Sequence, residues 1–450
     1  MSVSQLGVQR EIDDATAWLR GLIDVERRPD WPYQRFSLDP IRALLARLGN
    51  PERALPAVHI AGSKGKGSTA LFAEAILLGA GRRVGTFTSP HLERWTERFR
   101  IDGVELEEAR LAQVISAVRP HVDALRLESP DLAPTFFDAT TAIAFLIFRD
   151  ALLDCAVLEV GLGGRLDSTN ACVSAVSCVT SIELEHTDRL GHTYAAIAAE
   201  KAGILRPGVP AVVGALPDEA LAVVLRRAAE VGAPVSRFGV DFGSELLGAD
   251  LEGSRVRLWD GALDVTVRLP LLGAPSVHNA ALAAACARRL LGTALPAEKL
   301  GEVVADALSR ASLPGRIEVV SRHPLVIVDA AHTADSARAL AAVLAGVGRP
   351  LHLVLSISEG KDVDAILAAL LPLGTSLTAT RAEPARSLDT DALAKRAQHF
   401  APGLRVIAEP DPRCAVRDAR ARCADGEALC VTGSVYLAGI ARAELRSSSA

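Results

Sequence analysis

The sequence has little of what marks secreted, nucleic-acid-binding or membrane proteins. Its seven cysteines are odd in number and include no C-x-x-C pair, which argues against a disulfide framework and against a zinc knuckle. A net charge of −5 is small for 450 residues, so no nucleic-acid surface or polybasic membrane anchor is indicated. No apolar stretch is long enough to cross a bilayer, and the charged N-terminus lacks the apolar core of a signal peptide. We therefore expect a folded protein of the reducing cytoplasm that binds small molecules, and neither nucleic acid nor a membrane.

The most informative stretch is residues 57–73, AVHIAGSKGKGSTALFA, in which an apolar strand enters a glycine-rich loop and leaves it as a helix. Glycines allow the backbone N–H groups of such a loop to point inward, and the helix start adds the positive end of its dipole. Lys66 is then placed to touch the outer phosphates of ATP, and Ser68 offers a hydroxyl to the accompanying Mg²⁺. The predicted ATP-binding residues of the loop are Gly62, Ser63, Lys64, Gly65, Lys66, Gly67, Ser68 and Thr69.

The spacing of this loop differs from the general P-loop, in which the hydroxyl residue directly follows the lysine. Gly67 intervenes here between Lys66 and Ser68. The form G-x-x-G-K-G-[ST] resembles the ATP loop of the Mur ligase superfamily, whose members join an amino acid to a carboxylate. The alternative is a flexible Gly/Lys turn that binds no ligand.

Strands and helices alternate along most of the chain, which predicts a parallel sheet covered by helices. Helices are expected at residues 9–23, 40–48, 106–125, 136–153, 218–231 and 278–291, and strands at 82–88, 155–161, 175–182 and 210–216. Asp260, Gly261 and Ala262 predict the turn of an antiparallel hairpin. A second alternating run, with five strands from residue 325 to residue 432, is enough for a separate α/β domain, with a boundary at residues 292–296.

Eight motifs occur in the order and spacing of the folylpolyglutamate synthase and dihydrofolate synthase family. They are HIAGSKGKGST, TSPHL, FFDATTAIAF, LEVGLGGRLDSTN, EHTDRLGHTYAAIAAEKAGI, HNAALAA, LPGRIEVV and VIVDAAH. The chain resembles this family over nearly its whole length. The resemblance implies a Mur-ligase-like ATP-binding domain at residues 1–294, with a mostly parallel sheet and a small antiparallel appendage. It also implies a smaller Rossmann-like C-terminal domain at 295–450, and we expect a monomer.

The resemblance implies a magnesium site and a modified lysine. The metal ligands would be Ser68, Ser89, Glu159 and His186, with water and phosphate oxygens completing the coordination of Mg²⁺. Glu159 stands near the end of a predicted strand, where ligands bind in open α/β sheets. Lys201 matches a lysine that the family carbamylates with CO₂, which requires a neutral amine. The alternative is an ordinary ammonium paired with a carboxylate, Glu200 or Glu159.

The resemblance assigns further ATP contacts across the domain boundary. Asn279 would bind the base, Arg316 the phosphates and Asp329 the ribose, and each assignment fits the donor or acceptor chemistry of the group. The catalytic candidates are Lys66, Lys201 and His332. We expect His332 near the phosphate or the incoming glutamate. The alternative is that it is an ordinary loop histidine.

The pterin-bearing substrate is assigned to two segments that similar proteins use. Aromatic rings stack on a flat heterocycle and a carboxylate accepts its amino hydrogens. The predicted substrate-binding residues are Phe136, Phe137, Asp138, Leu166, Asp167 and Ser168. The two phenylalanines could equally be core residues at the start of a helix.

The sequence departs from the family pattern at three places. Ser63-Lys64 replaces the usual T-N and adds a cation beside the phosphates. The family's D-G-A-H-N-P reads D-A-A-H-T-A at residues 329–334, which puts the loop geometry in question. The F-F-E of many members is F-F-D at residues 136–138, one methylene shorter.

We therefore predict an ATP-dependent ligase that adds L-glutamate to dihydropteroate or a folate. A carboxylate must be activated before it reacts with an amine, and transfer of the γ-phosphate of ATP to it gives an acyl phosphate. One alternative is a cell-wall ligase of the same superfamily, although only about 55 residues precede the loop, too few for its nucleotide-sugar domain. Another is a P-loop switch that binds ATP without catalysis, which would not need Glu159, His186 and Lys201 together.

Overall fold

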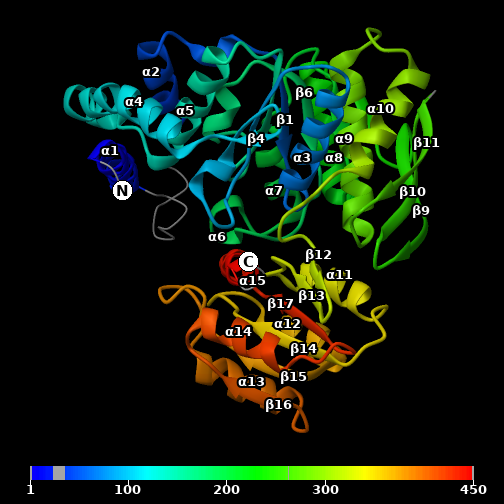
Figure 1. Ribbon diagram of the computed structural model, residues 1–450. Coiled ribbons are helices and arrows are strands. Elements are labelled where there is room, and N and C mark those ends of the chain that lie inside the picture. The colour runs from blue at the N-terminus through cyan, green and yellow to red at the C-terminus, as the bar shows by residue number, and fades with distance from the viewer. Residues whose placement is uncertain (1–2, 24–35, 262, 448–450) are drawn as a thin grey trace.

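Short apolar runs form the strands of two main sheets, one in each of two lobes (Figure 1). The computed structural model describes residues 3–23, 36–261 and 263–447. The larger sheet has the order β4-β3-β2-β5-β1-β6-β7-β8 and is parallel from β2 to β8. Its strands are β1 (Ala57–Ala61), β2 (Val84–Phe87), β3 (Phe99–Ile101), β4 (Val104–Glu105), β5 (Cys155–Glu159), β6 (Ser174–Val179), β7 (Ala211–Val213) and β8 (Val235–Arg237).

Alternate side chains of the central strands enter different cores on the two faces of this sheet. Val157 of β5 packs with α3 (Lys66–Gly79) and α9 (Ala274–Leu291). Leu158 packs on the other face, with α4 (Glu108–Glu128) and α5 (Phe136–Asp150). The remaining helices of this part are α1 (Val3–Arg20), α2 (Asp39–Arg47), α6 (Thr187–Leu190), α7 (Tyr194–Ala202) and α8 (Asp218–Val231).

A three-stranded antiparallel sheet flanks the larger lobe, as the hairpin prediction requires. It consists of β9 (Phe242–Asp250), β10 (Gly253–Asp260) and β11 (Leu263–Leu269), in the order β11-β10-β9. Asp260 pairs with Leu263 across the predicted turn, in which Ala262 lies outside the described residues. Strands β10 and β11 match the predicted hairpin, whereas β9, whose last six residues are exposed, was not predicted from the sequence.

Helix α10 (Ala297–Ser309) packs on α3 and β11, and its Leu300, Val304 and Leu308 lie in the core of the larger lobe. The boundary predicted from residues 292–296 assigns this helix to the second domain. Its packing places it with the first, so we propose that the boundary lies between Ser309 and Gly315.

The smaller lobe has the sheet order β12-β13-β17-β14-β15-β16, in which β12 alone runs antiparallel to its neighbour (Figure 1). The five predicted strands are present as β13 (Leu325–Val328), β14 (Leu351–Leu355), β15 (Gly374–Ala379), β16 (Arg405–Ala408) and β17 (Ala428–Thr432), joined by β12 (Glu318–Arg322). The helices are α11 (Ala334–Leu344), α12 (Val363–Leu370), α13 (Thr390–Phe400), α14 (Pro412–Arg422) and α15 (Val435–Ser447).

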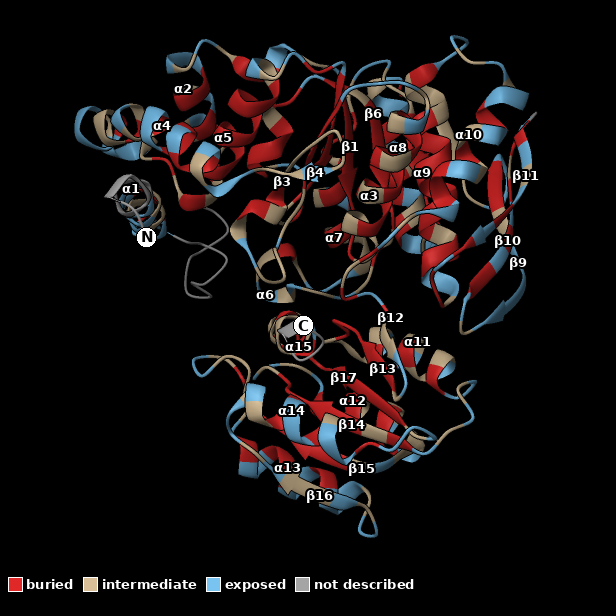
Figure 2. Ribbon diagram, in the orientation of Figure 1, coloured by how far each residue is buried: buried red, intermediate tan, exposed pale blue. Residues whose placement is uncertain are grey.

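Both lobes bury their central strands beneath helices whose outer faces are exposed (Figure 2). The predicted fold class is confirmed: a mostly parallel α/β sheet with an antiparallel appendage, followed by a smaller α/β domain. Within the described part of the chain, no helix combines the length and the apolar character that crossing a bilayer requires.

Candidate active site

The glycine loop lies between β1 and α3, as predicted, and is braced by the end of β6. Gly62 and Gly65 have φ values of 154° and 82°, which favour glycine. The backbone N–H of Lys64 donates to the Ser181 hydroxyl at 2.8 Å, and the Thr180 hydroxyl donates to the Lys64 carbonyl at 2.6 Å. These bonds fix the loop against the residues that follow β6.

Lys66 lies at the centre of the charges around the loop. Its ammonium donates to the Gly62 carbonyl at 2.9 Å, so the side chain folds back over its own loop. The Lys66 charge also opposes the burial-raised pKa of Glu159 and contributes to lowering the pKa of Glu185. A phosphate bound to the loop would therefore lie next to the Lys66 ammonium.

Three of the four predicted metal ligands line one cavity. Ser68, Ser89 and Glu159 lie in the wall of a space of about 460 Å³ between the lobes. The Ser89 backbone N–H donates to Glu159 Oε2 at 2.9 Å, and burial raises the pKa of this carboxyl. Hydroxyl and carboxylate oxygens beside a phosphate-binding loop form a donor set that suits Mg²⁺.

His186, the fourth predicted ligand, does not line this cavity. It has a left-handed backbone, with φ of 47°, just before α6. Burial lowers the pKa of His186 to about 4; Glu185 opposes this change and Lys361 adds to it, so the imidazole is neutral near pH 7. A neutral imidazole can bind a metal ion.

Lys201 is almost fully buried, with 2% of its side chain exposed, and it faces the glycine loop from α7. Its ammonium donates to the Gly62 carbonyl at 2.9 Å and to Glu185 Oε1 at 3.2 Å. Burial lowers the pKa of Lys201 from 10.5 to about 8, and Glu185 opposes this change. The structure thus pairs Lys201 with Glu185, whereas the sequence analysis named Glu200 and Glu159 as the alternative partners.

Glu185 is a site residue that the sequence analysis missed. Burial alone would raise the pKa of Glu185, but its cationic neighbours, Lys201 foremost, lower it to about 2. Its position next to the metal-ligand candidate His186, in the run ELEH, was the available signal.

The predicted ATP contacts beyond the loop come from two lobes. A Cβ placed on Gly65 would lie 2.3 Å from Asn279 Oδ1, so the Asn279 side chain rests on the loop. Arg316 lines the interlobe cavity together with Ser68. Asp329 is buried, and its two oxygens accept the N–H groups of Ile317 and Ala331, each at 2.8 Å. Asp329 therefore fixes the segment that carries Arg316.

His332 reaches across the lobes to the loop. Its Nε2 lies 3.4 Å from Lys64 Nζ, and its Nδ1 lies 2.9 Å from the Ala330 carbonyl. Burial, followed by the Lys64 charge, lowers the pKa of His332 to about 3. The imidazole is therefore neutral, with Nδ1–H donating to Ala330 and Nε2 accepting from Lys64. Lys64 thus contacts the D-A-A-H-T-A loop. Both Lys64 and this loop are places where the sequence departs from the family pattern.

The loop that follows Ser89 is inserted into the smaller lobe. We call residues 90–94 the docking loop. Its Leu92 packs against the apolar cluster that includes Ala438 of α15, and a Cβ on Gly439 would lie 2.1 Å from the Leu92 carbonyl oxygen. Arg442 of α15 pairs with Glu93, and with Glu318 at 2.7 Å. The chain segment that carries Ser89 is thereby tied to the second lobe.

A second cavity of about 470 Å³ contains most of the predicted pterin-binding residues. Its wall includes Phe137, Asp138, Leu166, Asp167 and Ser168. Phe136 is outside that wall and packs on Trp95, with ring centroids 5.3 Å apart, as the core alternative anticipated.

The two predicted carboxylates in this wall, Asp138 and Asp167, are already hydrogen-bonded. Asp138 accepts the Ser168 hydroxyl at 2.6 Å and caps α5 through Thr135. Asp167 accepts the backbone N–H groups of Leu162 and Thr169, at 2.9 and 3.0 Å. The acidic wall is therefore preorganised.

Comparison with known proteins gives a consistent relationship along the chain. The Mur ligase middle domain matches residues 121–287, and the Mur ligase glutamate ligase domain matches residues 315–435. The chain is 36% identical over 457 residues to the dihydrofolate synthase/folylpolyglutamate synthase of Mycobacterium tuberculosis, covering 94% of both chains. It is 38% identical over 342 residues to the Escherichia coli protein of the same description, covering 74% of this chain and 75% of that one.

Solved structures agree with this relationship. A crystal structure of M. tuberculosis folylpolyglutamate synthase complexed with ADP and AMPPCP matches with a TM-score of 0.84 at 36% identity, covering 94% of this chain and 97% of the other. A structure of E. coli FolC in complex with DHPP and ADP gives 0.82 at 30% identity, covering 98% of each chain. The chain therefore belongs to the folylpolyglutamate synthase and dihydrofolate synthase family of Mur ligases.

Proposed function

We propose that the protein is an ATP-dependent ligase that adds L-glutamate to the carboxylate of dihydropteroate or a folate through an acyl phosphate. It would act in the cytoplasm as a monomer. The names of its relatives support the reaction class, and the two cavities support the substrate class.

The observation that carries the proposal is the proximity of the two cavities at the end of β5. Glu159 lines the interlobe cavity, and Gly161 and Leu162 line the second cavity. Two residues of extended chain span at most about 7 Å. A flat heterocycle held beside Phe137 could therefore extend its carboxylate toward the γ-phosphate of ATP.

The residues around the loop have distinct roles in this reaction. The loop N–H groups and Lys66 would hold the phosphates, and Arg316 would neutralise their charge from the second lobe. Ser68, Ser89, Glu159 and His186 would hold Mg²⁺, which supplies charge neutralisation at the transferring phosphoryl group. Asn279 beside the loop would contact the base, and Asp329 would position Arg316 and accept a ribose hydroxyl.

We further propose that Lys201 is carbamylated. With a pKa of about 8, about half of its amine is neutral at pH 8, against about 0.3% for an ordinary lysine of pKa 10.5. The neutral amine attacks CO₂ and loses a proton, which replaces a cation by an anion. Lys64 and Lys66 would then balance that anion and Glu185.

His332 is a poor general base, because a pKa of about 3 leaves its proton affinity low at neutral pH. We propose that it positions Lys64 over the phosphates when the lobes are together. Asp138 and Asp167, held by their hydrogen bonds, would accept the amino hydrogens of a pterin.

The proposal is tested with purified protein, ATP, Mg²⁺ and L-glutamate, together with either dihydropteroate or tetrahydrofolate. We expect phosphate release that depends on one of these acceptors and a product heavier by one glutamate in the mass spectrum. Lys201→Ala should abolish turnover and retain ATP binding, whereas a nucleotide switch would be little affected. If neither dihydropteroate nor tetrahydrofolate leads to phosphate release, the proposed substrate class is wrong.

A further inference from the structure

Three chemically different side chains lie close together in the smaller lobe, at the edge of its sheet opposite the edge that carries Asp329 and His332. His352 is the second residue of β14, Glu427 directly precedes β17, and Cys423 follows α14. Because β14 and β17 are parallel, their amino ends lie side by side. Asp329 and His332, by contrast, follow the carboxyl end of β13, so the cluster is separate from the active site.

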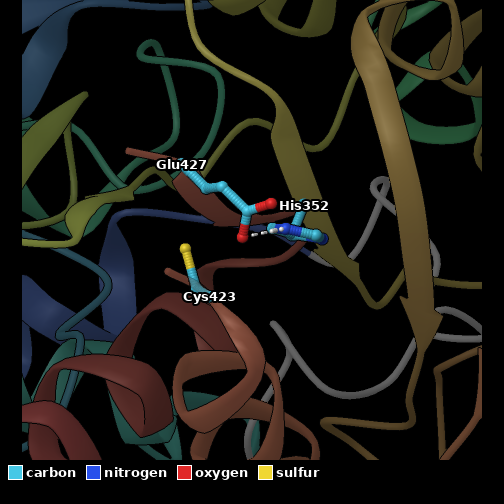
Figure 3. A group of neighbouring side chains, drawn as sticks. All are labelled: His352, Cys423 and Glu427. Carbon is cyan, nitrogen blue, oxygen red and sulfur yellow. Dashed lines mark hydrogen bonds and ion pairs between the residues drawn. The ribbon is translucent and has the colours of Figure 1, made fainter. Parts of the chain in front are cut away.

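The potential ligand atoms of His352, Cys423 and Glu427 all lie within 4.8 Å of one another (Figure 3). Figure 3 shows the Cys423 sulfur on the same side as the Glu427 carboxylate, which a dashed line joins to the His352 ring. We propose that these three side chains form a binding site for Zn²⁺ or a similar borderline divalent cation, with water as the fourth ligand.

The donor set determines which cation fits. Thiolate, imidazole and carboxylate are the protein ligands of zinc, with bonds of about 2.0 to 2.3 Å. In a tetrahedral site such ligand atoms are roughly 3.3 to 3.7 Å apart, so contraction by about 1 Å closes the cluster. Mg²⁺ requires hard oxygen ligands and is disfavoured here, so the two metal sites of this chain differ in the metals they bind.

The second layer of contacts orients the imidazole for metal binding. His352 and Ser376 are register partners on neighbouring strands, and His352 Nδ1 lies 2.6 Å from Ser376 Oγ. The other nitrogen, Nε2, lies 3.0 Å from Glu427 Oε2. A cation that binds Nε2 displaces its proton, and Nδ1–H then donates to Ser376, the arrangement typical of metal-bound histidines.

The turn that carries Glu427 is also fixed. The Ala424 N–H donates to Glu427 Oε2 at 2.9 Å, and the Glu427 N–H donates to the Ala424 carbonyl at 2.9 Å. Glu427 Oε1 takes part in neither of these bonds nor in the contact with His352. The side chains of His352 and Glu427 are 20% and 30% exposed, which leaves a path for the ion and room for a water ligand.

Metal binding here would join three parts of the smaller lobe. The ion would connect the turn between α14 and β17 with β14, and, through Ser376, with β15. Since the reaction site lies at the other edge of the sheet, the cation would stabilise the lobe without entering the chemistry.

The experiment uses untagged full-length protein, stripped of metal by chelator dialysis and then kept in excess Mg²⁺ to occupy the oxygen-rich site. Co²⁺ is added as a spectroscopic substitute for Zn²⁺. We expect one Co²⁺ per chain with a thiolate-to-metal charge-transfer band, displaced by Zn²⁺, and a rise in Tm on adding Zn²⁺. Absence of the band or of stoichiometric binding would overturn the proposal.

Two cysteine variants form a matched pair. Cys423→Ser should lose the band and the Zn²⁺-induced rise in Tm while retaining ligase turnover, which also verifies its folding. Cys414→Ser, in α14 but outside the cluster, should retain both. A band that persists in Cys423→Ser, or disappears in Cys414→Ser, would show that a different cysteine binds the metal. Failure of ligase turnover in every protein, with the Co²⁺ band intact, would refute the proposed function alone.

Discussion

The contact between Lys201 and Glu185 allows the contribution of Lys201 to stability to be measured separately from its contribution to catalysis. In protein kept free of CO₂, where Lys201 carries an ammonium, Lys201→Met removes that charge from a site where 2% of the lysine side chain and 12% of the glutamate side chain are exposed. Breaking a buried ion pair by removing one partner costs about 3 to 5 kcal/mol, because the other charge is left behind. Lys64 remains 3.6 Å from Glu185 and compensates in part, so we expect a loss at the lower end, about 3 kcal/mol.

Adding Glu185→Gln to Lys201→Met removes the stranded charge. We therefore expect the double variant to recover about 1 to 2 kcal/mol of the lost free energy of unfolding. Catalysis should respond differently, since a neutral pair restores stability but not the chemistry of the amine. Turnover should be lost in both the single and the double variant.

Urea unfolding followed by tryptophan fluorescence is the suitable measurement. All four tryptophans, at positions 18, 31, 95 and 259, precede the proposed domain boundary, so the signal reports on the lobe that contains the ion pair. A loss below about 1 kcal/mol for Lys201→Met, or strictly additive effects of the two substitutions, would refute the interpretation of this contact as a strongly coupled pair.

Three further predictions concern other parts of the site. Gly161→Ala places a Cβ 2.5 Å from the Phe137 ring, so we expect the KM for the acceptor to rise about tenfold, or about 1.4 kcal/mol, with the KM for ATP little changed in steady-state kinetics. Gly439→Ala places a Cβ 2.1 Å from the Leu92 carbonyl oxygen and displaces the docking loop, so the Mg²⁺ concentration for half-maximal turnover should rise about tenfold. With ¹³C-bicarbonate, a carbamate NMR signal from Lys201 should grow as pH rises through about 8, because deprotonation exposes the reactive amine.

Each of these predictions has a control. Gly403→Ala and Gly426→Ala add a Cβ that meets no atom within 4 Å, so they should change neither KM nor the Mg²⁺ requirement. An unchanged acceptor KM in Gly161→Ala would argue against the second cavity as the pterin site. An unchanged Mg²⁺ requirement in Gly439→Ala would argue against coupling through the docking loop. A carbamate signal that persists in Lys201→Met would come from another amine.

The sequence predicted the elements that have strong local signals. The glycine loop, the strand ending at Glu159 and the five parallel strands of the smaller lobe all combine apolar runs with clear boundaries. Several short strands were missed, since β3, β4 and β8 are only two or three residues long. Their pairing comes from neighbouring strands rather than from their own composition.

The motifs predicted most of the residues of the candidate site, but they did not predict which of these residues contact one another. Glu159 was placed by the rule that ligands bind at the carboxyl ends of strands, Ser68 by the glycine loop and Ser89 by the family resemblance, and the three line one cavity. The pairing of Lys201 with Glu185 was not predicted, because it depends on how α7 packs against the loop. The contact between Lys64 and His332 depends on the relation of the two lobes, which no local pattern contains.

The docking loop has a consequence for how the molecule would open. Ser89 is adjacent in the chain to residues that are clasped by α15, and its backbone N–H is bonded to Glu159. Any hinge motion that swings the lobes apart must either pull this segment out of α15 or drag it away from Glu159. In the first case, separation of the lobes breaks the contacts between Leu92 and α15. In the second case, it separates Ser89 from Glu159, two of the proposed metal ligands. In this second case, departure of the spent nucleotide and loss of the bound cation would be a single event.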